Sequence, residues 1–430
     1  MTEPRRLDPV SERLRTFADE AAAATAVPAL GPHPRRGRHR RGRTLVLVGA
    51  AVVVFIAAGV LALVYGPRSA NNGPGTPTTH HPKRTPSTVV GRLRSTTFTG
   101  AFQPSEIVSA AGRLWLIDER ALSSGTGTCS AGALDPASLT VHPFPLASCG
   151  FNAVAGGGHL YLETETGQPG TNDWLVHIES VSLAQPSSVV LAPVDVTVVG
   201  SEIAHTQLAY ANGHLWLDAY SSDRGQTVVE IAPASGVVVG TFTGVPPGGG
   251  VEPLLTAGPG GVWAAGGAGG STSPAVVNGV GTGAVHVLPP VVASNENGTI
   301  EWMAPVGALM WLDVATFTPS QGLRQTQMEE RLVEMDSAGT VVRRSGVEAL
   351  GSSLVTVGGN LYSVGDADSC AVVHVYRVDP ASLHATVVAT LRPPGASCLG
   401  GSERPVAAVG GSLYVLNPTS SGSVLYRYTP

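Results

Sequence analysis

Charged residues, and lysine above all, are scarce in this chain of 430 residues. Lys83 is the only lysine, charged residues make up 13% of the chain and aromatic residues 5%. A coiled coil needs abundant Glu, Lys and Leu at heptad spacing, and an intrinsically disordered chain needs high charge with few apolar residues. The low charge excludes the first class, and the 43% hydrophobic content excludes the second.

Glycine and proline, in contrast, are abundant. The chain has 54 Gly and 33 Pro, and the glycines follow no Gly-X-Y period, which excludes a collagen triple helix. Gly and Pro at this level mark turns. The composition therefore predicts a turn-rich, β-rich protein that is long enough for one large domain with additional segments.

The charges are distributed unevenly along the chain. Residues 1–43 contain ten Arg and five acidic residues, whereas the chain from residue 96 onward contains 11 Arg and 26 Asp or Glu. The first segment thus carries a charge of +5 and the second −15. This asymmetry indicates two parts in different surroundings.

An uncharged run separates these two parts. Residues 44–65, TLVLVGAAVVVFIAAGVLALVY, contain no charged side chain and as a helix would span about 33 Å, enough to cross the hydrocarbon core. Six arginines directly precede the run, so the positive-inside rule predicts that residues 1–43 are cytoplasmic and the bulk of the chain extracytoplasmic. The alternatives are a cleaved signal peptide, whose apolar region is shorter, and a twin-arginine export signal at Arg40-Arg41.

Two short segments flank the predicted transmembrane helix. Residues 8–25 carry apolar residues on one helical face, which predicts a short amphipathic helix in the basic tail, either a docking element for a cytoplasmic partner or a tail with a topogenic role only. Residues 66–88 are rich in Pro and Thr and predict an extended extracytoplasmic spacer. Membrane topology accounts for the arginine cluster, so no nucleic-acid partner is expected.

The remainder of the chain, residues 89–430, is a repeat. A turn with a small residue precedes an aliphatic-aromatic-aliphatic step seven times, at intervals of 46 to 55 residues, with the aromatic residues Trp115, Tyr161, Trp216, Trp263, Trp311, Tyr362 and Tyr414. Seven repeats of about 50 residues predict an all-β fold, a seven-bladed β-propeller of four-stranded antiparallel blades. The aromatic residues are expected to pack between blades.

The ends of the repeat region predict how the ring closes. The last repeat has three strands, so its fourth strand is expected from residues 87–97, which precede the first complete repeat. Pairing of the two ends would leave no open edge.

Four cysteines lie in the repeat region, and none forms a Cys-x-x-Cys pair. An even number of cysteines beyond a membrane segment indicates disulfides in an oxidising compartment. Cys129 and Cys370 precede the turn between strands three and four of their repeats, and Cys149 and Cys398 follow it. An antiparallel hairpin brings such positions together, so we predict the pairs Cys129–Cys149 and Cys370–Cys398.

The glycine-hydrophobic-aromatic steps such as GHLWLDA (213–219) and the turns LDPASLT (134–140) and VDPASLH (378–384) resemble those of streptogramin-lyase-like and YVTN/NHL-like propellers. The resemblance covers about 89–430 and lies in structural repeat residues. It implies the propeller fold. A lyase of this kind would use a catalytic His with acidic metal ligands on the loop face, and no residue of this sequence is carried over to those roles.

The repeat also predicts which residues face the loops that usually carry function in propellers. That face is acidic, and the candidate binding residues are Glu106, His205, Glu301, Glu403 and Arg404. The sequence contains neither a Gly-x-Ser-x-Gly nucleophile motif nor a His-Glu-x-x-His zinc motif. No catalytic residue, cofactor or metal is therefore assigned, and Ca²⁺ is the metal that such carboxylates would suit.

Together these features predict a single-pass cell-membrane protein with a cytoplasmic N-terminus. Its extracytoplasmic propeller is expected to act as a non-catalytic binding, sensor or scaffold module for a cell-wall component, a peptide or a protein. The alternative is a lyase or hydrolase with its site on the loop face.

Overall fold

The computed structural model describes the chain from residue 91 to residue 430, with gaps. The described ranges are 91–119, 128–167, 174–185, 187–194, 196–198, 206–221, 225–246, 253–266, 272–278, 283–293, 297–319, 326–346, 348, 350–351, 353–366, 372–393, 405–419 and 422–430. The predicted tail (1–43), transmembrane helix (44–65) and spacer (66–88) lie outside these ranges. Within them, no helix is long and apolar enough to cross a membrane.

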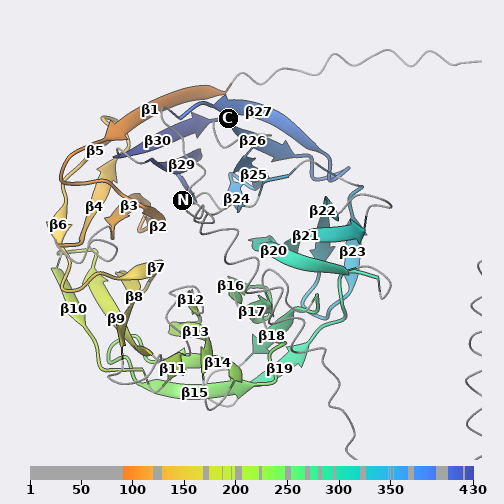
Figure 1. Ribbon diagram of the computed structural model, residues 1–430, viewed down its shortest axis with the longest axis horizontal. Coiled ribbons are helices and arrows are strands. Elements are labelled where there is room, and N and C mark those ends of the chain that lie inside the picture. The colour runs from red at the N-terminus through yellow and green to blue at the C-terminus, as the bar shows by residue number, and fades with distance from the viewer. Residues whose placement is uncertain are drawn as a thin grey trace, which may run out of the picture. The chain divides into compact units, whose positions relative to one another are not determined.

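The described residues form an all-β ring of seven four-stranded antiparallel blades (Figure 1). Blade 1 contains β2 (Glu106–Ala110), β3 (Arg113–Asp118), β4 (Ser130–Asp135) and an outer strand that Pro143 interrupts, β5 (Thr140–Val141) and β6 (Phe144–Pro145). Blade 2 contains β7 (Phe151–Gly156), β8 (His159–Gly167), β9 (Trp174–Ser182) and β10 (Ser187–Val190). Blade 3 contains β12 (Thr206–Ala211), β13 (His214–Ser221), β14 (Gly225–Ile231) and β15 (Val238–Thr243). The short strand β11 (Thr197–Val198) pairs with both β9 and β13 and so joins blades 2 and 3.

The other four blades follow the same order from the centre outward. Blade 4 contains β16 (Pro253–Gly258), β17 (Gly261–Gly266), β18 (Ala275–Asn278) and β19 (Ala284–Val287). Blade 5, with the longest strands, contains β20 (Asn297–Val306), β21 (Leu309–Pro319), β22 (Thr326–Met335) and β23 (Val341–Arg344). Blade 6 contains β24 (Ser353–Val357), β25 (Asn360–Asp366), β26 (Val373–Val378) and β27 (Ala385–Leu391). Blade 7 contains β28 (Val406–Val409), β29 (Ser412–Thr419), β30 (Gly422–Thr429) and β1 (Arg92–Phe98).

Blade 7 is built from both ends of the repeat region, as predicted. The strand β1 pairs antiparallel with β30 from Arg92↔Thr429 to Phe98↔Ser423 and lies outermost in its blade (Figure 1). The closing strand, Arg92–Phe98, lies in the expected segment 87–97 except for its last residue, Phe98. Because the two ends pair within one sheet, the ring has no break between its first and last blades.

The repeated aromatic residues pack between blades, which confirms that they are core residues. All seven are buried. Each belongs to a hydrophobic cluster that also contains residues of the following blade: Trp216 packs with Leu255 and Val262 of blade 4, and Tyr414 with Ile107 and Leu114 of blade 1. Trp263 also donates a hydrogen bond from Nε1 to the Pro259 carbonyl (2.9 Å). Seven such clusters form the core of the ring.

Turn residues set the hairpins at one end of the blades. The Asn212-Gly213 turn between β12 and β13 has φ of 54° and 82°, the left-handed conformation that a two-residue hairpin requires. Between β4 and β5, Asp135 Oδ1 accepts the Ala137 N–H (2.8 Å), and Asp379 Oδ1 does the same for Ala381 (2.8 Å) between β26 and β27. The Ala137 N–H lowers the pKa of Asp135, and the N–H groups of Ser382 and then Ala381 lower the pKa of Asp379. The Asp turns predicted from the sequence are therefore present.

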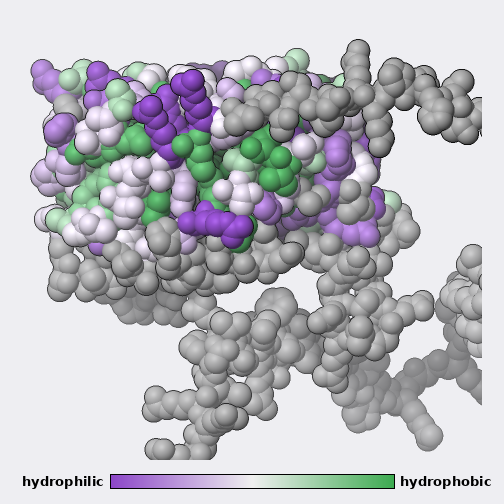
Figure 2. Space-filling model, turned by 90° about the horizontal axis from the view of Figure 1, so that it is seen from above, coloured by the Kyte–Doolittle hydropathy of each residue, from purple (hydrophilic) through white to green (hydrophobic). Residues whose placement is uncertain are grey.

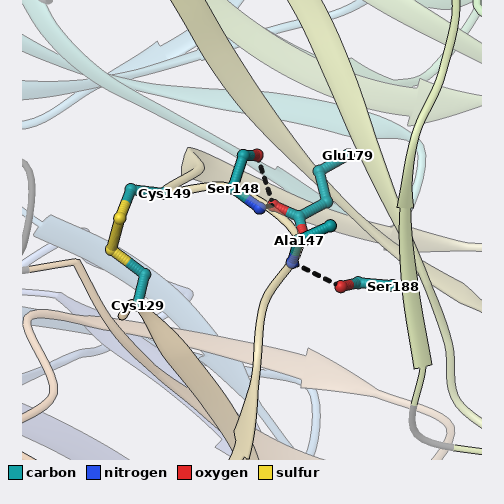
Figure 3. Close-up of a disulfide and its surroundings, with 6 residues drawn as sticks. All are labelled: Cys129, Ala147, Ser148, Cys149, Glu179 and Ser188. Atoms are coloured by element: carbon teal, nitrogen blue, oxygen red, sulfur yellow. Dashed lines mark hydrogen bonds between the residues drawn. A yellow bond between two sulfur atoms is a disulfide. The ribbon is translucent and has the colours of Figure 1, made fainter. Parts of the chain in front are cut away.

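The Cys129–Cys149 disulfide is formed, as predicted, and fastens the outer part of blade 1 (Figure 3). Next to it, the buried Glu179 carboxylate of blade 2 accepts hydrogen bonds from the Ala147 N–H (2.6 Å) and the Ser148 hydroxyl (2.7 Å). The disulfide therefore holds the segment that contacts blade 2. The second predicted pair, Cys370–Cys398, lies outside the described residues.

The outer wall of the ring has hydrophobic and hydrophilic residues side by side (Figure 2). The exposed large hydrophobic residues lie on or directly before the outer strands of six blades, one or two at each: Leu93, Val189, Val190, Val237, Val239, Val287, Val342 and Val387. Hydrophobic residues scattered in this way do not indicate a docking site.

Candidate binding site at the central channel

The inner strands of blades 3 to 6 line an open cavity on the inner side of the ring. Its volume is about 390 Å³, and β12, β16, β20 and β24 line it with Gln207, Leu254, Leu255, Thr256, Trp302, Met303, Ala304, Pro305, Leu354, Val355 and Thr356. Figure 1 shows these four strands facing the middle of the ring. Small-molecule and peptide-side-chain sites are typically apolar cavities of about 300–1,000 Å³ with few polar groups. We call this feature the channel cavity.

The two largest polar side chains of the channel cavity bond within its wall. Trp302 donates from Nε1 to the Leu354 carbonyl of blade 6 (3.1 Å), and Gln207 accepts the Leu255 N–H of blade 4 through Oε1. Both bonds cross from one blade to the next, so they hold the inner strands together. Because these polar atoms are engaged, the channel cavity presents mainly apolar surface to a ligand.

Four carboxyl groups gather where the inner strands of blades 1 and 2 meet. Glu106 begins β2, Glu119 follows β3, and Glu163 and Glu165 lie on β8. We call these four residues the carboxylate cluster. Glu106 Oε1 accepts the Ala153 N–H of β7 (2.5 Å), and Glu163 Oε2 accepts a hydrogen bond from the Asn152 side chain (3.3 Å).

Burial raises the pKa of every member of the carboxylate cluster. Burial, and then the negative charge of Glu119, raises the pKa of Glu106 to about 8. Burial raises the pKa of Glu163 to about 8, with smaller contributions from the charges of Glu165 and Glu106. The pKa of Glu165 rises to about 7 through burial, and that of Glu119 also rises for this reason. The low polarity around these groups thus favours their neutral form near neutral pH.

Two members have a buried oxygen without a hydrogen-bond partner, Glu106 Oε2 and Glu165 Oε1. The hydroxyl groups of Ser105 and Thr206 lie against Glu119 and Glu163, and these contacts lower the pKa of the two carboxyls, which opposes the effect of burial. Buried polar atoms without a partner are rare in native proteins and point to water, an ion or a ligand.

Other buried carboxyl groups lie on the second strands of other blades. Burial raises the pKa of Asp218 to about 8, and Asp218 Oδ1 accepts a hydrogen bond from Gln226 Nε2. The pKa of Asp313 in blade 5 is raised by burial and then by the charges of Glu330 and Glu301. Asp118 in blade 1 accepts the Gln103 N–H (2.8 Å). These groups share a position near the end of strand two, which explains the acidic character predicted for this face.

The residues predicted from the sequence fall in different places. Glu106 belongs to the carboxylate cluster, and Glu301 lies on β20 beside Asp313 and Glu330. Glu106 and Glu301 occupy the inner strands of blades 1 and 5, which are not neighbours in the ring. His205, Glu403 and Arg404 lie outside the described residues. The structure therefore groups Glu106 with three acidic residues of blades 1 and 2 and does not group it with Glu301.

Sequence reasoning did not identify the channel cavity. The repeat carries no signal for it. At the inner-strand position that pairs two residues past the repeated aromatic, Gln207, Leu254 and Trp302 line the cavity, whereas Glu106 and Ser353 at the same position do not. Within the described ranges, no three His, Cys, Asp or Glu side chains are arranged to hold a metal ion.

Comparisons with known proteins return similarity of fold only. No known protein family matches the sequence, and no curated protein matches it. Among solved structures, Sqt1 of Saccharomyces cerevisiae is 14% identical, with 74% of this chain and 81% of that chain covered and a TM-score of 0.44. The β-propeller domain of the Trilobed protease from Pyrococcus furiosus is 10% identical, with 76% and 95% covered and a TM-score of 0.44. Apo AztD from Citrobacter koseri is 11% identical, with 73% and 80% covered and a TM-score of 0.39. Identities this low say nothing about function.

Proposed function

We propose that this protein is a membrane-tethered, extracytoplasmic binding module whose propeller holds an apolar group of its ligand in the channel cavity, without catalysis. The ligand is a peptide, a protein segment or a cell-wall component outside the cell. The membrane tether and the cytoplasmic tail of this proposal rest on the charge and hydropathy of residues 1–65.

The observation that carries the proposal is the channel cavity itself. Its volume of about 390 Å³ suits one or two large apolar side chains, and Trp302, Pro305 and Val355 are the larger apolar residues of its lining that are not buried in the core between blades. Its walls come from four blades, and hydrogen bonds of Gln207 and Trp302 join the inner strand of blade 3 to that of blade 4 and the inner strand of blade 5 to that of blade 6. The site is thus pre-formed, which reduces the entropy cost of binding.

An enzyme remains the second candidate because of one observation. Carboxyl groups whose pKa is raised to about 7 or 8 resemble the general acids of hydrolases. Glu163, Asp218 and Asp313 are fully buried, however, so they do not reach a substrate in this conformation. Turnover of wall-derived glycans by the full chain, lost in Glu165→Gln, would establish this alternative.

The proposal is tested by binding of a defined probe to the full chain in detergent micelles. The probe is a fluorescein-labelled, C-amidated pentapeptide with two central leucines, and the comparison probe has alanines in their place. Thr256→Trp fills the channel cavity, while Thr96→Trp adds the same ring at a half-buried position of the outer strand β1. Fluorescence anisotropy should show binding of the leucine peptide that Thr256→Trp abolishes and Thr96→Trp preserves. Equal binding of both peptides, or no binding, would overturn the proposal.

A further inference from the structure

Side chains of one blade bond to the inner edge of a neighbouring blade at several places around the ring. The innermost strand of each blade is paired on one side only, so its other edge directs backbone N–H and C=O groups toward the channel. We call the bonds to these groups the inner-edge bonds. They join Glu106 to the Ala153 N–H, Asn152 to the Thr206 carbonyl, Gln207 to the Leu255 N–H, Trp302 to the Leu354 carbonyl and Thr356 to the Pro305 carbonyl.

The register of the blades shows that the backbone of Met303 also points toward the channel. Leu255 and Leu354 take part in inner-edge bonds, and each pairs with the residue after the repeated aromatic of its blade. Met303 holds this position in blade 5, since it pairs with Leu312. Two residues further along β20, the Pro305 carbonyl likewise bonds to another blade. Alternate residues of a strand direct their N–H and C=O groups to the same side, so those of Met303 face the channel cavity.

Blade 4 supplies no inner-edge bond to Met303, because the residue at the relevant position is aliphatic. Gln207 makes its inner-edge bond from the position that pairs two residues past the repeated aromatic, and Leu254 holds that position in β16. The Leu254 side chain packs in the core between blades 4 and 5 and offers neither a donor nor an acceptor. Within the described ranges, no side chain bonds to the N–H or the C=O of Met303. Both groups are therefore open to a ligand in the channel cavity.

The neighbouring residues of β20 limit this open edge to Met303. On one side, the regular register of β20 with β21 is interrupted between Ile300 and Trp302. On the other side, Pro305 has no N–H, and its carbonyl accepts a hydrogen bond from Thr356 Oγ1 (3.4 Å). A ligand can therefore exchange both kinds of backbone bond with one residue of β20 only.

An open N–H and an open C=O on the same residue select an extended peptide. In an antiparallel pair, two opposite residues exchange both N–H···O=C bonds, which requires an N–H and a C=O on the two sides of one ligand Cα. A single trans amide, such as the acetamido group of an amino sugar, points its N–H and C=O in opposite directions and cannot make both bonds. The partly exposed Trp302 and Val355 of the lining offer apolar contacts to the side chains of such a peptide.

We infer, on the basis of the proposed function, that the channel cavity binds a peptide in extended conformation, one residue of which exchanges two backbone hydrogen bonds with Met303. The ligand is thereby narrowed from any molecule with an apolar group to a peptide chain. In this mode of recognition, main-chain bonds to a free strand edge supply affinity, and the surrounding side chains supply selectivity.

The first test replaces the amide N–H groups of the leucine pentapeptide by ester oxygens, one at a time. An ester removes one donor and leaves every side chain unchanged. In competition with the labelled parent peptide on the full chain in detergent micelles, one ester should bind about fivefold more weakly. Esters at the residues adjacent to it should bind as the parent does, because their N–H groups point to the other side of the strand. Equal affinities for all esters would overturn the inference and leave the proposed function intact, whereas no binding of the parent peptide would contradict the proposed function.

A second measurement observes Met303 directly. The chain has only five methionines, so labelling of methionine with a nitrogen isotope gives an NMR spectrum with few amide signals. The variant Met303→Leu, which keeps the backbone, identifies the Met303 signal. Addition of the peptide should shift the Met303 amide proton downfield and leave the signals of Met310 and Met335, which pair with each other in β21 and β22, in place. A Met303 signal that does not move when the peptide is bound would overturn the inference.

Leu254→Gln gives blade 4 the side chain that makes the inner-edge bond in blade 3. The introduced amide should accept the Met303 N–H, weaken binding of the peptide about fivefold and remove the shift of the Met303 signal. Val108→Gln adds the same amide at a half-buried position of β2, outside the cavity lining, and should preserve both. A folded Leu254→Gln chain with unchanged affinity and an unchanged shift would overturn the inference. If this variant does not fold, the ester series and the Met303 signal of the unmodified chain decide.

Discussion

Glu163 shows at the scale of one residue how burial governs ionisation in this protein. It is fully buried, and burial raises its pKa from 4.5 to about 8. The folded protein therefore holds a proton on Glu163 over a pH range in which the unfolded chain has released it. By linkage, the stability that this bound proton contributes is fully present below about pH 4.5 and is lost as pH rises through about 8.

Glu163→Gln should therefore stabilise the protein at alkaline pH. At pH 8.5 we expect the free energy of unfolding to rise on the order of 3 kcal/mol, because the variant no longer has to bury a charge, and to change little at pH 4.5. Thermal unfolding of the full chain from pH 4.5 to 9 measures the effect. Glu329→Gln, which removes a partly exposed carboxyl paired with Arg331 (3.2 Å), should keep the pH dependence of the unmodified chain. If the free energy of unfolding varied with pH in the same way in Glu163→Gln and in the unmodified chain, the raised pKa of Glu163 would be contradicted.

The same residues show where prediction from sequence ends. The repeat fixes the position of Glu163 and Asp218 near the end of strand two, next to the loops of the acidic face. Their burial depends on how neighbouring blades pack, and one sequence does not contain that information. The gathering of Glu106 with Glu119, Glu163 and Glu165 likewise follows from the contact between blades 1 and 2.

At the scale of elements, the Cys129–Cys149 disulfide joins the start of β4 to the segment that leads into blade 2. It closes a loop with a sequence separation of 20 residues. The disulfide reduces the number of conformations open to the unfolded chain. In the chain-entropy description this stabilises the fold by about 3 kcal/mol. The neighbouring bonds from Ala147 and Ser148 to Glu179 depend on this segment staying in place.

Cys129→Ala combined with Cys149→Ala should lower the stability of the chain by about 3 kcal/mol under non-reducing conditions. Thermal unfolding with and without reductant measures this, with Cys370→Ala combined with Cys398→Ala as the matched pair for the second predicted bridge. Mass spectrometry of non-reduced fragments reports the connectivity. A Cys129–Cys370 linkage would contradict the blade arrangement described here.

The strands themselves were largely predictable, because turns and hydrophobic alternation repeat seven times. The positions of the hairpins at Asn212-Gly213 and of the Asp turns at Asp135 and Asp379 follow from local backbone requirements. The interruption of the outer strand of blade 1 and the bridging strand β11 have no counterpart in the repeat, so they were not predicted.

At the scale of the whole molecule, our proposal puts a large acidic ring and a small basic tail on opposite sides of a membrane. We predict that protease added to intact spheroplasts digests an epitope at the C-terminus and spares one at the N-terminus, because the arginines before residue 44 stay in the cytoplasm. Permeabilised cells provide the control in which both epitopes are digested. Release of a soluble C-terminal fragment would indicate a cleaved leader instead.

The pairing of β1 with β30 also has a consequence for how the ring assembles during synthesis. The partners Phe98 and Ser423 are 325 residues apart. At about 5–20 residues per second, β1 waits roughly 15–65 s after its synthesis before its partner strand exists. Six blades can form in order during that time, each on the one before, while the seventh and the closed ring come last. Ring closure is therefore expected to be the slow, final step of biogenesis, and the unpaired β1 the stretch most in need of a chaperone until then.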